Sequence, residues 1–190
     1  MKFDNKFKGN VTQTIIQTLL EHSDYCVVPL GIEELIREIK MADGKQYNQL
    51  LFPNTLRTLP DFLILEKNFS KKWLIEVKYR KEWNKDVVKK LLSDIEKQVL
   101  LWDEIYLAIF TGTSSGEKDD YPSSWLRFMR LVPAEGKIMH KTEDTNYVCP
   151  YSLSWKDLMR IQDIFPNISN NWNEQTLRKV TKLIRPLGSF

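Results

Sequence analysis

The segment from Leu59 to Lys81 constrains the fold more than any other stretch of this chain. It contains two short apolar runs, residues 62–65 and 73–75, which are separated by polar residues at 67–70. Pro60 stands before the first run. Apolar runs of this length that are bounded by turn-forming residues are typical of paired strands. The segment therefore predicts a β-hairpin.

The second strand of this hairpin carries charge on one face. Because side chains alternate across a strand, Glu76 and Lys78 project side by side, on the face opposite Val77. Asp61 can reach the same place from the first strand. Two carboxylates and an ammonium are unfavourable in a mostly buried hairpin unless a cation neutralises them. Asp and Glu oxygens suit Mg²⁺, and a lysine beside the metal can orient the attacking water, so the pattern predicts a divalent metal site.

Pro60-Asp61 followed by Glu76-Val77-Lys78 resembles the motif of the PD-(D/E)xK nuclease superfamily, which includes Holliday-junction resolvases and many restriction enzymes. The resemblance implies an α/β fold in which helices flank a mixed central β-sheet. It further implies a restriction-endonuclease-like core of order αβββαβ in residues 1–112. Residues 113–190 would then form a C-terminal strand and helical extension, packed with the core into one compact domain.

The same resemblance implies the roles of individual residues. Asp61, Glu76 and Lys78 would be catalytic, and Mg²⁺, with Mn²⁺ as a substitute, would be held by the two carboxylates and the backbone carbonyl of Val77. The alternative is an edge hairpin on which Glu76 and Lys78 form a surface ion pair, worth only about 0–1 kcal/mol.

The third acidic ligand does not follow the family pattern. Gln13 stands on the first predicted helix where the family often has Glu, and an amide coordinates a cation more weakly than a carboxylate. We expect Glu33, in preference to Glu34, to complete the metal site. The alternative is that both are first-turn acids, favoured by the dipole of a short helix over residues 33–41.

Three polar residues are expected to contact the substrate: Gln13, Arg80 and Gln98. Gln98 lies on a helix predicted from residue 85 to Trp102, which Asn84 caps and whose apolar stripe recurs at helical spacing. Related nucleases place a polar residue of this helix beside the metal. The alternative is a Gln98 side chain that faces solvent beside i,i+4 neighbours.

Periodicity and turn residues predict the remaining elements. A capping box of Asn10 and Gln13 opens a helix that runs to about His22, and an irregular segment covers residues 42–58. Further predictions are a fully buried strand at 25–30, a mid-sheet strand at 104–111, a flexible loop at 113–124, a strand at 125–132 with Arg127 and Arg130 outward, loops at 133–150 with a short strand near Tyr147, a helix from Ser154 to Pro166, and a last helix from Asn173 with a basic face.

Composition limits the class of protein. The 190 residues include two cysteines, Cys26 and Cys149, too far apart to indicate a zinc site, so we expect packed thiols in a reducing cytoplasm. The N-terminal residues lack the apolar core of a signal peptide, and no stretch is long enough to span a membrane. A net charge of only +3 makes any phosphate-binding surface local.

The sequence thus predicts a metal-dependent nuclease that hydrolyses phosphodiester bonds, a DNA endonuclease of repair, recombination, defence or transposition. Its expected partner is nucleic acid, DNA before RNA, with a homodimer and a larger protein complex both left open. The alternative function is a non-catalytic nucleic-acid-binding or assembly subunit that keeps the nuclease fold.

Overall fold

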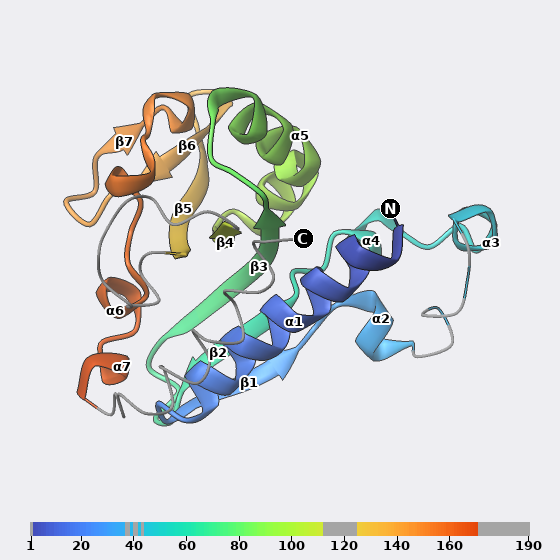
Figure 1. The fold of residues 1–190 in the computed structure, drawn as a ribbon, viewed down its shortest axis with the longest axis horizontal. Coiled ribbons are helices and arrows are strands. Elements are labelled where there is room, and N and C mark those ends of the chain that lie inside the picture. Colours follow the sequence, from blue (N-terminus) through green and yellow to red (C-terminus); the bar gives the residue numbers. More distant parts are fainter. Residues whose placement is uncertain (1, 37–38, 40–41, 43, 112–124, 171–190) are drawn as a thin grey trace.

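The computed structural model describes residues 2–36, 39, 42, 44–111 and 125–170, which form an α/β structure around one mixed sheet (Figure 1). The sheet has seven strands in the order of the chain: β1 (Tyr25–Pro29), β2 (Phe62–Glu66), β3 (Lys72–Arg80), β4 (Ile105–Thr111), β5 (Leu126–Ala134), β6 (Lys137–Lys141) and β7 (Tyr147–Val148). Neighbouring strands are antiparallel except for β3 and β4, which are parallel and are joined by a crossover through a helix.

Helices lie on both faces of this sheet. Helices α1 (Lys2–Glu21), α6 (Ile161–Ile164) and α7 (Asn167–Asn170) pack on one face, and α5 (Lys85–Trp102) packs on the other. The described residues also form the short helices α2 (Ile32–Leu35), α3 (Gly44–Gln49) and α4 (Asn54–Arg57) and the 3₁₀ turns η3 (Pro150–Ser152) and η4 (Trp155–Asp157). Among the described residues, no helix combines the length and apolarity needed to cross a membrane.

The core consists of two apolar layers, one on each side of the sheet. The first layer contains the apolar face of α1, together with side chains of β1 to β5 and of the C-terminal helices; its members include Ile16, Leu20, Ile64, Ile75, Phe110, Phe128 and Phe165. The second layer contains the apolar stripe of α5 packed on β4 and β5: Val88, Leu92, Ile95, Val99, Leu107, Ile109, Met129 and Leu131. Alternation along β4 feeds both layers, which explains why that strand is buried along its whole length.

The predicted hairpin is confirmed. Strands β2 and β3 are antiparallel, with Phe62 opposite Ile75 and Ile64 opposite Trp73. The turn between them places Phe69 at a φ of 57°, in the left-handed region that tight turns use. The mid-sheet position of β4 and the helix after the hairpin are confirmed as well: the Asn84 side chain accepts a hydrogen bond from the amide of Val87, at 2.9 Å, and caps α5.

Four predictions are wrong: the capping box at Asn10, the full burial of the strand at 25–30, the packed thiols and the irregular segment at 42–58. Helix α1 begins at Lys2, so Asn10 lies inside it and no capping box starts there. Within the described ranges, strand β1 is an edge strand that pairs only with β2, and it is not fully buried. Its Cys26 is exposed, as is Cys149, and neither is the packed thiol that we expected. Residues 42–58 are not irregular throughout, because they include α3 and α4.

Three predictions for residues 125–166 are wrong. Arg127 is 2% exposed, because it alternates on the same face of β5 as Met129 and Leu131; it does not point outward. Residues 133–150 contain the hairpin of β5 and β6, which sequence analysis missed. The predicted helix from Ser154 is split into η4 and α6, since Met159 pairs with Phe128 of β5. The predicted loop at 113–124 and the last helix lie outside the described residues.

Candidate functional site

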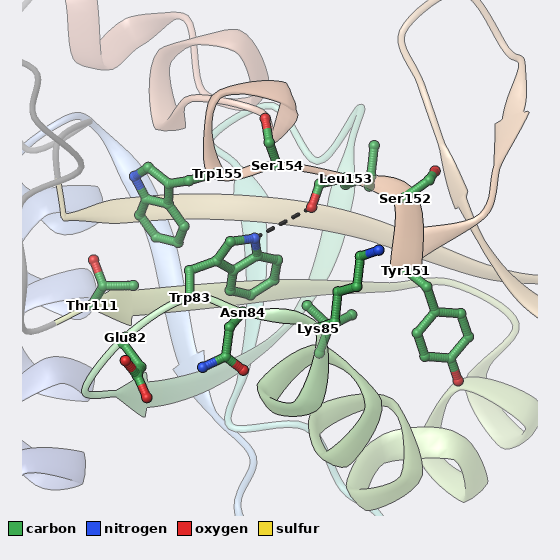
Figure 2. Close-up of a pocket in the computed structure, with 11 residues that line it drawn as sticks. Glu82, Trp83, Asn84, Lys85, Thr111, Tyr151, Ser152, Leu153, Ser154 and Trp155 are labelled. Atoms are coloured by element: carbon green, nitrogen blue, oxygen red, sulfur yellow. Dashed lines mark hydrogen bonds between the residues drawn. The ribbon is translucent and has the colours of Figure 1, made fainter.

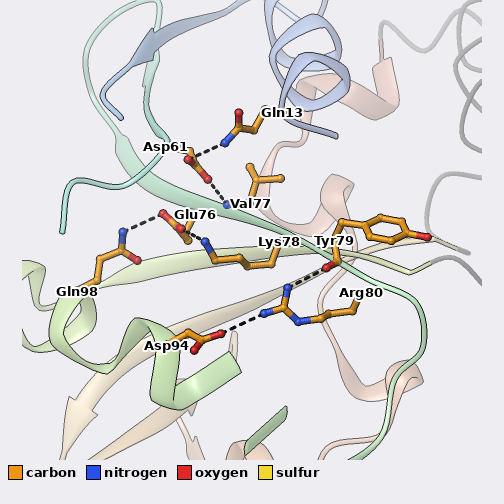
Figure 3. Close-up of polar contacts among 9 residues, drawn as sticks. All are labelled: Gln13, Asp61, Glu76, Val77, Lys78, Tyr79, Arg80, Asp94 and Gln98. Atoms are coloured by element: carbon orange, nitrogen blue, oxygen red, sulfur yellow. Dashed lines mark hydrogen bonds and ion pairs between the residues drawn. The ribbon is translucent and has the colours of Figure 1, made fainter. Parts of the chain in front are cut away.

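The side chain of Asp61 is fixed between the sheet and α1. Asp61 immediately precedes β2, where its Oδ2 accepts a hydrogen bond from the backbone amide of Val77 at 2.7 Å (Figure 3). Its Oδ1 accepts a second bond, at 2.8 Å, from Nε2 of Gln13 on α1. The carboxylate thus accepts the hydrogen bond that a backbone carbonyl of a neighbouring strand would otherwise accept from Val77. It lies where β2 and β3 separate.

Glu76 is held from two sides within the sheet. Its Oε1 pairs with the ammonium of Lys78, two residues along β3, and its Oε2 accepts a hydrogen bond from Gln98 Nε2 of α5 at 2.8 Å (Figure 3). Both Glu76 and Gln98 are only 7% exposed. In the described part of the chain, Gln98 Oε1 is buried and accepts no hydrogen bond.

Electrostatics show that Asp61, Glu76 and Lys78 act on one another, and we call these three residues the carboxylate cluster. Burial and the nearby charge of Glu76 raise the pKa of Asp61 to about 7, although Lys78 and the Val77 amide oppose the shift. Burial alone would lower the pKa of Lys78, but the charges of Glu76 and Asp61 outweigh burial and raise it. The cluster therefore holds more negative charge than one ammonium neutralises.

A cleft of about 470 Å³ opens beside Asp61. It is bordered by α1, by the residues after β1 and by the start of β2, and Gln13, Glu33 and Glu34 line it together with Asp61. Glu76 and Lys78 lie outside this lining. The charge of Glu33 adds a smaller contribution to the raised pKa of Asp61. Among the candidates for a third acid, Glu33 is thus electrostatically linked to the cluster.

Arg80 shares the strand face of Glu76 and Lys78 but has other partners. Its Nη2 lies 3.3 Å from Oδ2 of Asp94 on α5, and its Nη1 donates to the carbonyl of Tyr79 at 2.8 Å. Arg80 therefore lies next to the cluster without pairing with its carboxylates (Figure 3).

The structure brings most of the predicted site residues together. Asp61, Glu76, Val77 and Lys78 meet where β2 and β3 separate, and Gln13 and Gln98 contact the two carboxylates directly. Two of the alternatives are wrong: the Glu76 side chain is only 9% exposed, so its pair with Lys78 is no surface ion pair, and Gln98 does not face solvent. Sequence spacing contained the signal for Gln98, which follows Leu91 and Ile95 on the buried stripe of α5.

The donor set fits a hard divalent cation with few protein ligands. Asp61 and Glu76 supply two carboxylates, and in the described residues no three His, Cys, Asp or Glu side chains gather as a ligand set. Mg²⁺ commonly takes one or two carboxylates, keeps several waters and binds substrate phosphate. Two carboxylates and a nearby carbonyl at Val77 therefore suffice for such an ion.

Comparisons with protein-family models, with curated proteins and with solved structures give no match to this chain.

Proposed function

We propose that this chain is a metal-dependent nuclease of the PD-(D/E)xK type, an endonuclease that hydrolyses phosphodiester bonds in DNA. The observation that carries the proposal is the carboxylate cluster itself. Asp61 and Glu76 come from adjacent strands with Lys78 beside them, and amide groups of α1, β3 and α5 fix both carboxylates. Structural ion pairs rarely keep a surplus buried carboxylate, since its charged form is disfavoured.

The metal would be Mg²⁺, held by Asp61, Glu76 and the carbonyl of Val77, with Glu33 as the third acid on the side of the cleft. When bound, the ion supplies charge stabilisation for the phosphate and the leaving oxygen. Binding requires the ionised form of Asp61, whose pKa of about 7 makes proton release part of metal uptake.

The residues of this chain prepare the site for hydrolysis. Gln13 and the Val77 amide fix the two oxygens of Asp61, and Gln98 fixes the orientation of Glu76. Lys78, which lies beside Glu76, would hold the attacking water and stabilise the negative charge that grows on the phosphate.

The order of elements supports the same proposal. We infer that α1, β1, β2, β3, α5 and β4 constitute the restriction-endonuclease-like core, because this order is αβββαβ and the expected motif falls on β2 and β3. In this assignment β5 to β7 extend the sheet beyond the core.

The experiment is a cleavage assay on labelled duplex, branched and single-stranded substrates with Mg²⁺, Mn²⁺ or EDTA. Wild type is compared with Asp61→Asn, which keeps an oxygen to accept the Val77 amide but loses the negative charge. The proposal expects metal-dependent cleavage of at least one substrate and its loss in Asp61→Asn. Absence of cleavage from every substrate, or cleavage that survives in EDTA, contradicts it.

One observation favours the alternative of a non-catalytic nucleic-acid-binding or assembly subunit. Gln13, where the resemblance calls for Glu, donates its amide to Asp61, so the first helix supplies a hydrogen-bond donor in place of a ligand. Metal titration separates the two functions, since a subunit without a catalytic role has no need of a cation at Asp61 and Glu76.

A further inference from the structure

Figure 2 shows a second cavity. It lies on the side of the sheet that α5 covers, which is also the side of Glu76 and Lys78. It has a volume of about 470 Å³, within the range of small-molecule sites. Its lining comes from the end of β4, the start of α5 and the segment that includes η3 and η4. Thr111, which lines it, is paired with Arg80 of β3 and alternates with Ile109 and Leu107 of the α5 layer.

Three aromatic residues, Trp83, Tyr151 and Trp155, line this cavity. Trp83 and Trp155 lie with ring centres 5.6 Å apart and planes tilted by 59°, and Tyr151 lies on the rim, 46% exposed. The indole N–H of Trp83 donates to the carbonyl of Leu153 at 3.4 Å. The polar atom of the half-buried Trp83 is thus engaged, and the residue lines the cavity with its aromatic ring.

Helix α5 connects the cavity to the carboxylate cluster. Helix α5 begins at the cavity, where Val88 is part of the lining, and returns along the sheet to Gln98, which contacts Glu76. Ten residues of helix separate Val88 from Gln98, or about 15 Å at 1.5 Å per residue. A stacked nucleic-acid strand covers that length in about four or five nucleotides at 3.4 Å each.

A flat π-system is the ligand that such rings accept best. Every nucleobase presents one, which is why aromatic platforms bind single strands with little regard to sequence. Lys85, exposed at the start of α5, extends beside Trp83 and supplies a cation for the phosphate of the bound nucleotide (Figure 2). Bases inside a continuous duplex keep both faces in the stack and cannot enter such a site.

We propose that the Trp83 cavity binds an unpaired base of the nucleic-acid substrate, about four or five nucleotides from the phosphate that is cut. This inference rests on the proposed function, because it takes the carboxylate cluster as the place where the phosphate is cut. It defines the substrate class as single-stranded or branched nucleic acid, in preference to continuous duplex.

The test is equilibrium binding in EDTA, where no cleavage intervenes. Fluorescence anisotropy reports the binding of a labelled ten-nucleotide oligothymidylate and of a blunt-ended duplex of ten base pairs, which has no unpaired base. Trp83→Leu should weaken binding of the single strand at least about fivefold, as loss of one stacked base does, and Trp83→Phe should restore most of it. The matched control is Trp102→Leu, at the other end of α5, where the indole donates to the carbonyl of Thr58 at 2.8 Å.

Two additions keep the result decisive. A 2-aminopurine base in the single strand should be quenched by wild type and not by Trp83→Leu, which reports stacking directly. If Trp83→Leu lowers the melting temperature, the exposed Tyr151→Leu replaces it, since its ring lies at the rim of the cavity.

The proposal is overturned if wild type does not bind the oligothymidylate or binds the duplex as tightly, if Trp83→Leu and Trp102→Leu weaken binding equally, or if thymidine monophosphate competes as well as the oligonucleotide. A protein that cuts DNA but fails this test loses only the base site. A protein that binds the single strand through Trp83 but cuts nothing keeps the base site and loses the nuclease proposal.

Discussion

Two partly buried ion pairs lie in the same sheet, and they differ in their balance of charge. Lys78 pairs with Glu76 on β3, while Arg130 of β5 pairs with Glu104, which precedes β4. We call the second pair the Arg130 pair. The Nε and Nη2 atoms of Arg130 both donate hydrogen bonds to Glu104 Oε2, at 2.9 and 2.6 Å. The Arg130 guanidinium also lies 5.8 Å from the centre of the Tyr106 ring.

The Arg130 pair is complete by itself, with one acid, one base and an aromatic ring beneath the cation. The carboxylate cluster has a second acid, Asp61, whose pKa of about 7 records the lack of a second cation. The Asp61 carboxylate also borders a cleft, whereas the Arg130 pair lines none of the cavities described above. This comparison indicates that Arg130 and Glu104 serve the fold and that the cluster is arranged for a ligand.

The largest expected effect is a difference in cleavage rate between substitution of Lys78 and substitution of Arg130. Lys78→Met keeps the apolar stem but removes the ammonium, so cleavage should fall by about 10²–10³, the typical effect of one preorganised electrostatic group. Metal binding should persist, because the substitution removes a competing cation. Arg130→Met serves as the matched control and should cut at the wild-type rate. Equal cleavage by Lys78→Met and wild type, at matched melting temperatures, would contradict the assigned role.

The pH dependence of stability should also distinguish the two regions. The folded protein holds the Asp61 proton with a pKa of about 7, against 3.8 for an ordinary Asp, so between these values it binds more protons than the unfolded chain. The contribution of Asp61 to the free energy of unfolding is therefore largest below about pH 4 and decreases as the pH rises through about 7.

Urea unfolding from pH 4 to 8 measures this effect. Asp61→Asn lacks the titrating carboxyl group. The free energy of unfolding of wild type, relative to that of the variant, should therefore decrease as the pH rises across this range. Arg130→Met should leave the slope as in wild type. Parallel curves for wild type and Asp61→Asn would show that Asp61 titrates as an ordinary acid.

Metal titration of the cleft residues sharpens the comparison further. Glu33→Ala should weaken Mn²⁺ binding about tenfold, as loss of a supporting carboxylate does, because Glu33 acts on the charge of Asp61 across the cleft. Glu34→Ala and Gln13→Ala should change it less, since Glu33 is the acid of the cleft whose charge raises the pKa of Asp61, and an amide adds no charge. If only Gln13→Ala weakened binding, the placement of the third acid at Glu33 would be wrong.

The smallest expected effect is on the Arg130 pair. Arg130→Met should lower the free energy of unfolding by about 1 kcal/mol, because the Glu104 side chain is 37% exposed and regains water when its partner is lost. Thermal and urea unfolding measure the change, with Glu104→Gln as the matched variant. A loss several times larger would mean that the pair is buried more completely than its exposure indicates.

Sequence reasoning succeeded where a pattern was local. Alternation in β3 placed Glu76 and Lys78 on one face, and Asn84 marked the start of α5. It failed where distant contacts decided: Arg127 is buried because β5 is covered on both faces, and β1 is only partly buried because it ends the sheet. Gln98 was expected near the metal from the resemblance alone, and only the fold reveals that its side chain is buried and that Glu76 is its partner.

Calorimetric titration with Mn²⁺ tests most directly whether the carboxylate cluster is built for a cation. At pH 8, above the pKa of Asp61, wild type and Glu104→Gln should bind the ion alike, with release of heat that saturates. Glu76→Gln, which keeps its hydrogen-bonded neighbours but loses its charge, should lose that binding. Absence of binding by wild type, or equal binding by Glu76→Gln, would contradict the account.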